Sequence, residues 1–511
     1  MRLPYLKNIE QVTTRDIMEF RGINYSSVRK PGEFADSKNI SLDAYPCLTQ
    51  RKPRSVLMNN LTAPTAIFSK NGNMSYVDGT DFYFNGTKKG TLSAGKKQIT
   101  SVGDRIIIFP DKCYYDISEG KFGTLHNSYV SGAGQITFAE TTITTTGPDF
   151  TDFRKGDAIK ISGGSIPANN ITAIITGVAA KTLTFAAKTF TAGASSTATT
   201  IAREIPDMDY ICEYNNRLWG CKNNSIYASK QGDPFNFYYY AGVSIDSFAV
   251  DVGSDGNFTG ITGYTSHLVL FKENYIHKMF GVKPANFQLT TSQCAGLQPG
   301  CERSVAILND TIFYKSRIGI MAYAGNIPEL VSQNLGQKNY IDAIGDVEGQ
   351  TYYVSMNTGT KWELLAYNSQ HNIWVKEDDT HVADFTFHNN RLCYLNDVDK
   401  KVYAISEDNL ASEIIRWMVD FGELNEGINN PKTYVRFFIH AELEVGSTLR
   451  VSINCDRKGW KEIYFGMFEA RKTVRIPVVP TKCDIFSMKI EGSGKSRIFS
   501  VTKEVQQRGE K

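Results

Sequence analysis

The strongest constraint on the fold is a short strand-and-turn unit that recurs every 40 to 50 residues. In residues 209–229, short apolar runs alternate with Asn-containing turns, a pattern typical of an antiparallel meander. The spacing of the unit is that of one four-stranded propeller blade. The middle of the chain is therefore predicted to form a β-propeller. Equivalent positions in successive units are Leu218, Leu268, Ile312, Tyr352 and Leu392.

A block of different composition interrupts the repeat. From residue 131 to 203 Thr, Ala and Gly dominate, and Trp, Tyr and Cys are absent. Surface loops tolerate long insertions because loop-closure entropy grows only with the logarithm of length. Residues 131–205 are therefore predicted to form a small β-domain inserted between two blades.

The remaining segments complete an all-β organisation. Residues 1–60 show little periodicity and are predicted to be an N-terminal extended arm laid along a surface. Residues 61–130 contain the first propeller blades and residues 206–412 the remaining ones, about seven in all, with six or eight left open. Residues 413–511 have longer alternating strands, which favour a C-terminal jelly-roll-like β-sandwich.

Composition argues against several classes of partner. The formal net charge is only +3, which indicates neither a nucleic-acid-binding nor a membrane-binding protein. The N-terminal residues lack an apolar signal-like segment, and no run approaches the roughly 18 apolar residues of a membrane helix. The nine cysteines are odd in number and scattered, which is typical of reduced thiols. We expect a soluble chain without an export signal and without stable membrane association.

Two stretches resemble phosphate-binding loops but lack essential residues. Residues 90–97 (GTLSAGKK) fit G-x-x-x-x-G-K, but Lys97 stands where a hydroxyl must hold Mg²⁺, and a strand-like run follows in place of a helix. Near Gly494-Lys495-Ser496, Lys489 occupies the position of the first glycine. Both stretches are predicted to be turns.

Metal and catalytic motifs are incomplete as well. Residues 251–257 (DVGSDGN) loosely resemble a calcium loop, but Gly253 and Thr262 fall where the loop needs oxygen ligands. Neither a sialidase-type S-x-D-x-G-x-T-W box nor a G-x-S-x-G nucleophile elbow is present. We predict a protein that is not an enzyme, with no catalytic, cofactor-binding or metal-binding residues and no cofactor. The cysteines that come nearest to a zinc site, but without its C-x₂-C spacing, are Cys212, Cys221, Cys294 and Cys301.

Two recurring features are interpreted as structural. Arg105, Arg217 and Arg391 each follow an Asp- or Asn-containing turn and precede an apolar strand, so they are expected to hold turns or pair with carboxylates rather than form a ligand-binding ring. The aromatic run at residues 235–240 (FNFYYY) is expected to be an edge or an interface rather than a carbohydrate platform.

The amino-acid sequences of the repeats resemble those of a known protein family. EYNNRLWGCKNNSIYASKQGDPFNF, GSDGNFTGITGYTSHLVLFKENYIHKMFG and RIPVVPTKCDIFSMKIEGSGKSRIFSV are similar to segments of bacteriophage and prophage tail proteins built on a propeller. The N-terminal FRGINYSS and GEFADSKNISLDAYPCLTQRKPR also resemble the opening of such proteins. The family implied is the tail hub or nozzle proteins of short-tailed phages, which are also described as short-tail stabilisation proteins.

The resemblance implies a location and partners. Such proteins form a homo-oligomeric ring, usually a hexamer, below the portal and adaptor proteins, enclose the channel through which DNA is ejected, and support the tail fibres. The chain would then be a virion tail component assembled in the bacterial host cytoplasm, with DNA only transiently in the channel. A propeller suits this role because it is a rigid wedge with protected edges, and wedges repeated around an axis close into a ring.

An alternative from another class remains open: a receptor-binding or carbohydrate-degrading tail protein. The missing sialidase boxes and the absence of a long β-helix repeat favour the structural reading.

Overall fold

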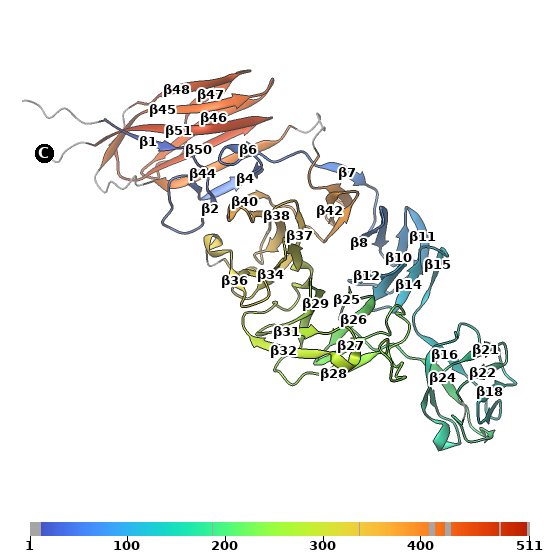
Figure 1. Ribbon diagram of the computed structural model, residues 1–511. Helices are drawn as coiled ribbons and strands as arrows, with labels where there is room; N and C mark the ends of the chain where they lie inside the picture. The colour runs from blue at the N-terminus through green and yellow to red at the C-terminus, as the bar shows by residue number, and fades with distance from the viewer. Residues whose placement is uncertain are drawn as a thin grey trace, which may run out of the picture.

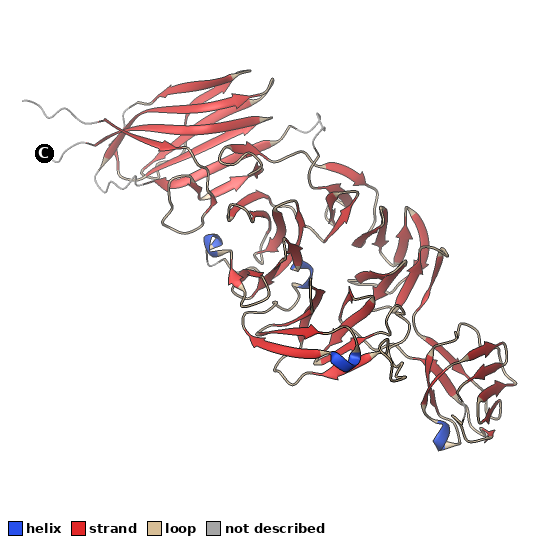
Figure 2. Cartoon of the chain, in the orientation of Figure 1, coloured by secondary structure: helices blue, strands red, loops and turns tan. Residues whose placement is uncertain are grey.

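Nearly all regular structure in the chain is β. The computed structural model describes residues 12–186, 188–336, 338–407, 414–424, 431–479 and 482–507. The helical pieces labelled within these ranges are 3-10 turns of three residues each, visible as short blue segments in Figure 2. None of them is long or apolar enough to cross a membrane. The prediction of an all-β chain is confirmed.

Asn-rich turns explain why the repeat is so visible in the sequence. Both central residues of the turns Asn215-Asn216, Asn309-Asp310 and Asn389-Asn390 have positive φ angles between 47° and 62°. A two-residue turn of this kind matches the twist of the flanking strands but needs left-handed backbone at both positions, which Asn and Asp tolerate better than other non-glycine residues.

Two four-stranded antiparallel sheets open the repeat, and each is a simple meander. Sheet 1 consists of β8 (Pro64–Lys70), β9 (Asn73–Asp78), β10 (Asp81–Phe84) and β11 (Thr87–Thr91). Sheet 2 consists of β12 (Gln98–Val102), β13 (Arg105–Phe109), β14 (Cys113–Asp116) and β15 (Lys121–Thr124).

Four further meanders follow after residue 209. Sheet 3 consists of β25 (Tyr210–Tyr214), β26 (Arg217–Lys222), β27 (Ser225–Ala228) and β28 (Phe248–Asp251). Sheet 4 consists of β29 (Phe258–Gly263), β30 (Leu268–Lys272), β31 (Tyr275–Phe280) and β32 (Gln288–Gln293). Sheet 5 consists of β33 (Ala306–Leu308), β34 (Thr311–Ser316), β35 (Gly319–Tyr323) and β36 (Glu329–Leu330). Sheet 6 consists of β37 (Asp342–Glu348), β38 (Thr351–Asn357), β39 (Trp362–Asn368) and β40 (Ile373–Asp378).

Sheet 7 takes its strands from two distant parts of the chain. Three come from the end of the repeat, β41 (Asp384–His388), β42 (Arg391–Asn396) and β43 (Lys401–Ala404). The fourth is β7 (Ser55–Met58), which pairs antiparallel with β43 so that Val56 lies opposite Tyr403. The N-terminal segment therefore completes the last sheet of the repeat.

The seven sheets form one module in which first strands lie beside one another. Contacts run from β8 to β12, then to β25 and β29, and from β33 to β37 and β41. The 3-10 turn η3 (Glu302–Ser304) contacts both β29 and β37. Strand β41 also contacts β8, which brings sheet 7 back beside sheet 1 (Figure 1).

Apolar side chains fill the spaces between neighbouring sheets. Phe82 of sheet 1 packs with Ile106 and Ile108 of sheet 2, and Trp219 of sheet 3 packs with Leu268 of sheet 4, all almost fully buried. Strands buried on both faces read as continuous apolar runs, such as RIIIF in β13. Close packing of this kind leaves little room for neighbouring sheets to shift relative to one another.

A small β-domain lies between sheets 2 and 3 in the sequence and projects at one end of the molecule (Figure 1). Its first sheet has the order β16 (Asn127–Val130), β24 (Thr200–Arg203), β19 (Ala158–Ser162), β20 (Thr172–Ile174). Its second has the order β21 (Gly177–Ala179), β22 (Thr182–Thr184), β18 (Thr142–Thr145), β17 (Ile136–Ala139), β23 (Gly193–Ala194), and η1 (Pro167–Asn169) lies between β19 and β20 in the chain. Its hydrophobic core contains five phenylalanines: Phe138, Phe150, Phe153, Phe185 and Phe190.

Two larger sheets form a C-terminal sandwich. The five-stranded sandwich sheet has the order β4 (Asp36–Lys38), β44 (Arg416–Leu424), β50 (Phe486–Ser493), β46 (Thr448–Cys455), β47 (Lys461–Met467). The seven-stranded sandwich sheet has the order β48 (Arg471–Pro477), β45 (Lys432–Leu443), β51 (Ser496–Gln507), β6 (Leu48–Gln50), β5 (Ile40–Ser41), with β1 (Val12–Ile17) on β51 and β49 (Lys482–Cys483) on β45. A parallel pair, β2 (Gly22–Ile23) and β3 (Glu33–Phe34), lies beside them.

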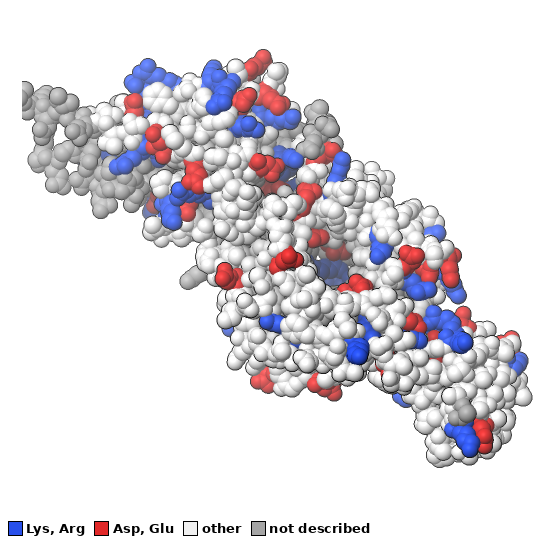
Figure 3. Space-filling model, viewed as in Figure 1, with Lys and Arg blue, Asp and Glu red and all other residues white. Residues whose placement is uncertain are grey.

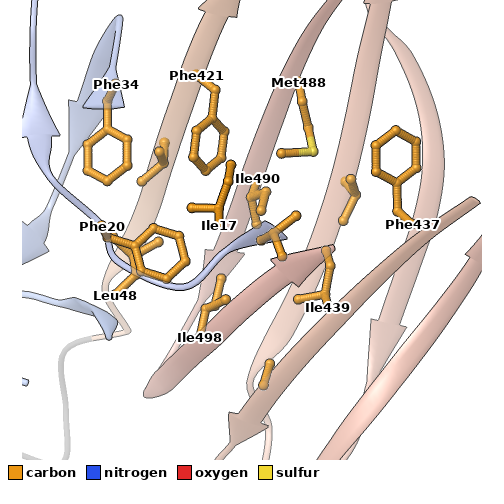
Figure 4. Packing of buried hydrophobic residues seen from close by; sticks show 14 of the residues in the cluster. Ile17, Phe20, Phe34, Leu48, Phe421, Phe437, Ile439, Met488, Ile490 and Ile498 are labelled. Carbon is orange, nitrogen blue, oxygen red and sulfur yellow. The ribbon is translucent and has the colours of Figure 1, made fainter. Parts of the chain in front are cut away.

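The N-terminal segment is part of this sandwich, which corrects the predicted extended arm. Ile17, Phe20 and Phe34 are almost fully buried with Phe421 and Met488 in one core (Figure 4). Strands of only two or three residues carry too little periodicity to be recognised in a sequence. The three-residue strands β4 and β6 are stable because the long strands β44 and β51 supply their hydrogen-bonding partners.

Replacing Phe34 by alanine tests this assignment. Phe34 is fully buried and meets the Phe421 ring edge-on with centroids 5.5 Å apart. We expect Phe34→Ala to destabilise the sandwich by about 3–5 kcal/mol, because a large cavity opens in a packed core. Met18→Ala is the matched control, since Met18 is 65% exposed in the same segment, and it should change stability by less than about 0.5 kcal/mol. Urea unfolding followed by tryptophan fluorescence gives the comparison, and equal effects of the two variants would contradict the assignment.

Candidate functional site

One arginine reaches across the centre of the seven-sheet module. Arg303 lies in η3, and its Nη1 donates to the carbonyl oxygens of Ala383 (2.7 Å) and Thr65 (3.4 Å). Its Nη2 donates to the carbonyl oxygen of Lys97 (2.8 Å), and Nη1 lies 3.7 Å from Asp384 Oδ1. A side chain that enters beside sheet 5 thus binds the starts of sheets 1, 2 and 7.

The segment before Arg303 is anchored on both sides. Leu297 is fully buried against Gly260, where any Cβ would lie 2.5 Å from a Leu297 methyl group, so β29 needs glycine at this position. Ser304 Oγ donates to the Cys301 carbonyl and accepts the backbone N–H of Lys315, while Tyr352 Oη donates to the Ser304 carbonyl. These bonds fix η3 and aim Arg303 inward.

Two carboxylates near this centre are shifted toward neutrality. Asp384 accepts the backbone N–H groups of Ile67 (3.0 Å) and Phe385 (3.2 Å), yet burial raises its pKa above the ordinary value, with Arg303 acting in the opposite direction. Burial also raises the pKa of Asp346 in β37 to about 6, and the charge of Asp384 adds to this shift.

The residues at the centre hold several sheets together. The Arg303 guanidinium binds three carbonyl oxygens and one carboxylate, so it is engaged on several sides. Among the described residues, no group of three or more His, Cys, Asp or Glu side chains could hold a metal ion. One side chain therefore links the starts of three sheets across this centre. Figure 3 shows a hollow at this centre, with a basic group inside and acidic groups around it.

An acidic cleft lies beside the module centre, between sheets 3 and 4. Its volume is about 430 Å³, and three carboxylates line it, from Asp209, Asp255 and Glu273. No lysine or arginine contributes to the lining, which includes Tyr210 and Phe258. The cleft is therefore suited to positively charged groups.

A second, polar cavity of about 580 Å³ lies where the N-terminal segment meets sheets 6 and 7. Its lining includes the Tyr45 and His371 rings, which stack with centroids 4.0 Å apart, together with several amide side chains. Glu377 also lines it, but this carboxylate binds Arg54 at 2.5 Å. Exposed Phe387 completes one side.

The structure places the incomplete sequence motifs in turns and strands. Lys97 is buried, with Nζ 2.6 Å from Asp111 and 2.9 Å from Ser93 Oγ, and strand β12 follows it directly. Gly494 has a φ of +78° in the turn between β50 and β51. Residues 251–257 connect β28 to β29, where Ser254 Oγ lies 3.0 Å from Nε2 of buried His277. The pKa of His277 is lowered to about 4 by burial and by Lys272.

The three recurring arginines are dispersed. Arg105 pairs with Asp116 at 3.0 Å in sheet 2, and Arg391 pairs with Glu407 at sheet 7. Arg217 is fully buried in sheet 3, where it donates to the carbonyl oxygens of Ser229, Ser244 and Asp246, among others. Each holds a local loop, and they do not meet in one site.

The aromatic run at 235–240 contacts the small domain. Phe235 is buried beneath the guanidinium groups of Arg105, Arg154 and Arg203, the nearest of which lies 3.8 Å from its ring centroid. Asn236 Oδ1 accepts the backbone N–H of Ala158 in β19 at 2.8 Å. This run therefore joins sheet 3 to the small domain.

Sequence reasoning missed Arg303 and its partners. Arg303 sits in the short segment PGCERS between strands, and its contacts at Thr65, Lys97 and Ala383 are mostly backbone atoms. A backbone acceptor leaves no trace in residue type. Arg303 depends on the positions of these backbone atoms, and no local sequence motif indicates them.

Comparisons with known proteins add no identification. No family model matches the chain, and no curated protein matches it. Similar solved structures include the phage phi92 endosialidase, at 11% identity over 74% of each chain with a TM-score of 0.27. The Pan2 WD40 domain of Neurospora crassa is 7% identical over 69% of this chain and 91% of its own, with a TM-score of 0.29. The exo-β-1,3-galactanase of Phanerochaete chrysosporium is 8% identical over 55% of this chain and 92% of its own, with a TM-score of 0.22. TM-scores this low support no argument about function.

Removing the Arg303 guanidinium tests the closure of the module. We expect Arg303→Ala to destabilise the module by about 2–4 kcal/mol, because Asp384 loses its nearby cation and three carbonyl oxygens lose a charged donor. Arg317→Ala serves as control, since the Arg317 side chain is 77% exposed. Thermal unfolding of both variants gives the result, and a wild-type melting temperature for Arg303→Ala would show that the bridge is dispensable.

The raised pKa of Asp346 predicts that the stability of the folded chain depends on pH. Its pKa is raised on folding, so the native state holds the proton more tightly and stability falls as pH rises from about 4 through about 6. We therefore expect Asp346→Asn to melt at a higher temperature than the wild type at pH 8 and at nearly the same temperature at pH 4. The exposed Asp104→Asn is the control and should show no such divergence. Parallel melting curves of Asp346→Asn and wild type at all pH values would refute the assignment.

Proposed function

We propose that the seven sheets are the blades of a β-propeller and that the chain is a structural component of a bacteriophage tail. Copies of it would form a ring-shaped nozzle or hub through which DNA is ejected and to which fibres attach. The observation that carries this proposal is the build of the chain, in which three sections are joined through buried contacts into one elongated body (Figure 1).

The connection between the sandwich and the propeller supports a structural role. Strands β2, β4 and β5 all contact β40 of sheet 6, and Ala366, Ile373 and Val375 of sheet 6 belong to the sandwich core. Ser37 and Lys376 exchange hydrogen bonds across this junction. An interface of apolar and polar contacts restricts relative motion of the two sections.

The channel for DNA would lie between copies and outside the propeller. Arg303 bridges three sheets at the propeller centre, which leaves no passage for a duplex there. A ring of wedge-shaped copies encloses its own axial channel when the rotation closes. Portal and adaptor proteins above the ring, and fibres around it, are the partners proposed on the family resemblance, with the virion tail as the location.

One observation favours the second candidate function, a receptor-binding or carbohydrate-degrading tail protein. The polar cavity at the junction of the N-terminal segment with sheets 6 and 7 combines a stacked Tyr45–His371 pair with amide and carboxylate groups. Such a lining can bind a sugar through stacking and hydrogen bonds. The carboxylate of Glu377 is held by Arg54, which weighs against its use as a catalytic acid.

Mass photometry and averaged electron micrographs of the purified chain test the structural role. We expect a closed ring of copies, six on the family resemblance, at micromolar concentration. A monomer or trimer at every concentration would contradict the nozzle. Cleavage or saturable binding of a host glycan by the isolated chain would establish the second function instead.

Deleting the sandwich is unsuitable as an assembly test. Removing residues 414–511 would expose Ile17, Phe20 and Phe34, because their core partners lie in the deleted strands. Loss of assembly in that truncation would then reflect misfolding as easily as a lost interface. Substitutions of surface residues test assembly without disturbing this core.

A further inference from the structure

We propose that copies of this chain associate head to tail, with the outer face of the five-stranded sandwich sheet of one copy docked on the acidic cleft between sheets 3 and 4 of the next. This inference rests on the proposed function, a ring of copies, and adds which surfaces of neighbouring copies meet. It names the two surfaces that meet and the charges that hold them.

The outer face of the five-stranded sandwich sheet carries basic and apolar groups in register. Strand pairing places Lys38 opposite Met418, Met418 opposite Glu491, Glu491 opposite Arg450, and Arg450 opposite Phe465. Side chains directly opposite one another in a sheet share a face. One row therefore presents two cations, one carboxylate and two apolar side chains.

A groove of about 790 Å³ follows this face. Its lining includes Arg416 and Ile414 in addition to the row just described. Ile414 is 74% exposed and Phe465 is 50% exposed, and Met467 beside Phe465 on β47 is 65% exposed. Large apolar side chains exposed together next to a groove mark an interaction surface.

Two cations on this face lack a carboxylate partner. Glu491 lies 3.4 Å from Lys489, and Arg450 lies 3.3 Å from Glu462. In the part of the chain that the structure describes, neither Lys38 nor Arg416 has an ion pair. The lining of the groove therefore has more cations than carboxylates, and this excess positive charge is available to a partner.

The acidic cleft offers the complementary charge. Among the described residues Asp255 forms no ion pair within 4 Å, and Asp209 and Glu273 have only long contacts, 3.8 Å to Lys222 and 3.6 Å to Arg317. Exposed pairs of this kind contribute little and exchange readily for new partners. Tyr210 and Phe258 in the same lining can meet the apolar groups of the sandwich face.

Net charge differs between the C-terminal strands of the sandwich and the part of the seven-sheet module that follows the small domain. Residues 414–507 contain fifteen Lys or Arg and eleven Asp or Glu, whereas residues 206–407 contain fifteen and twenty-two. Basic groups are prominent over the sandwich in Figure 3. Opposite net charges at two ends of one chain steer copies into a head-to-tail encounter. Contacts between two different surfaces generate rings or filaments, unlike the self-complementary contact of a two-fold dimer.

Charge-reversal variants test the inference on the full chain. Variant one carries Lys38→Glu and Arg416→Glu, and variant two carries Asp255→Lys and Glu273→Lys. Each alone should raise the concentration needed for half-assembly at least about tenfold, measured by mass photometry at low salt. The control for variant one, Lys472→Glu with Lys495→Glu, makes the same change in net charge as that variant but away from the proposed interface, and it should assemble as the wild type does. Circular dichroism and melting temperature verify folding of every variant.

An equal mixture of the two variants gives the decisive result. The intact basic face of variant two can meet the intact acidic cleft of variant one, and the two reversed surfaces also carry opposite charges. The mixture should therefore assemble at a lower concentration than either variant alone. Rings formed by either variant at wild-type concentration would overturn the inference while leaving the proposed nozzle intact. A wild-type chain that stays monomeric at low salt would overturn both.

Discussion

The fold depends on the pairing of the N-terminal segment with strands that lie hundreds of residues away. Strand β1 pairs with β51, β4 with β44, and β7 with β43. Each of these pairings covers an edge that would otherwise expose unpaired backbone groups, which is a liability in any sheet protein. A single segment therefore completes both sandwich sheets and the last sheet of the repeat. The sandwich and the seven-sheet module become one body because they share it.

Buried arginine side chains in this structure donate hydrogen bonds to backbone carbonyl oxygens and hold the chain in place. Arg303 ties three sheets together through carbonyl oxygens, Arg217 fixes a loop of sheet 3 in the same way, and Lys97 is neutralised by Asp111. Charged donors to carbonyl oxygens stabilise more than neutral ones, and they fix position as well. Groups engaged in this manner are poorly placed to bind a substrate. Surfaces that remain available include the acidic cleft, the polar junction cavity and the outer face of the five-stranded sandwich sheet.

The sequence predicted correctly those elements that are determined by residues close together in the chain. The Asn-Asn turns at 215–216 and 389–390 signal hairpins because few other residues adopt left-handed backbone, and the apolar runs between them have strand length. It failed where structure is decided by distant partners. Ile40–Ser41 and Leu48–Gln50 are too short to be seen as strands, and their register is set by each other and by β51. The role of Arg303 could not be recognised in the sequence either, because its acceptors are backbone atoms of Thr65, Lys97 and Ala383.

Amide hydrogen exchange of the full chain tests the central claim, that the N-terminal segment locks the sandwich and the seven-sheet module together. The account predicts that peptides covering β1, β4 and β7 are protected to the same degree as their partners β51, β44 and β43, because paired strands open together. Rapid exchange of the N-terminal strands alongside protected partners would contradict it, and would mean that the two sections are joined by something other than this segment.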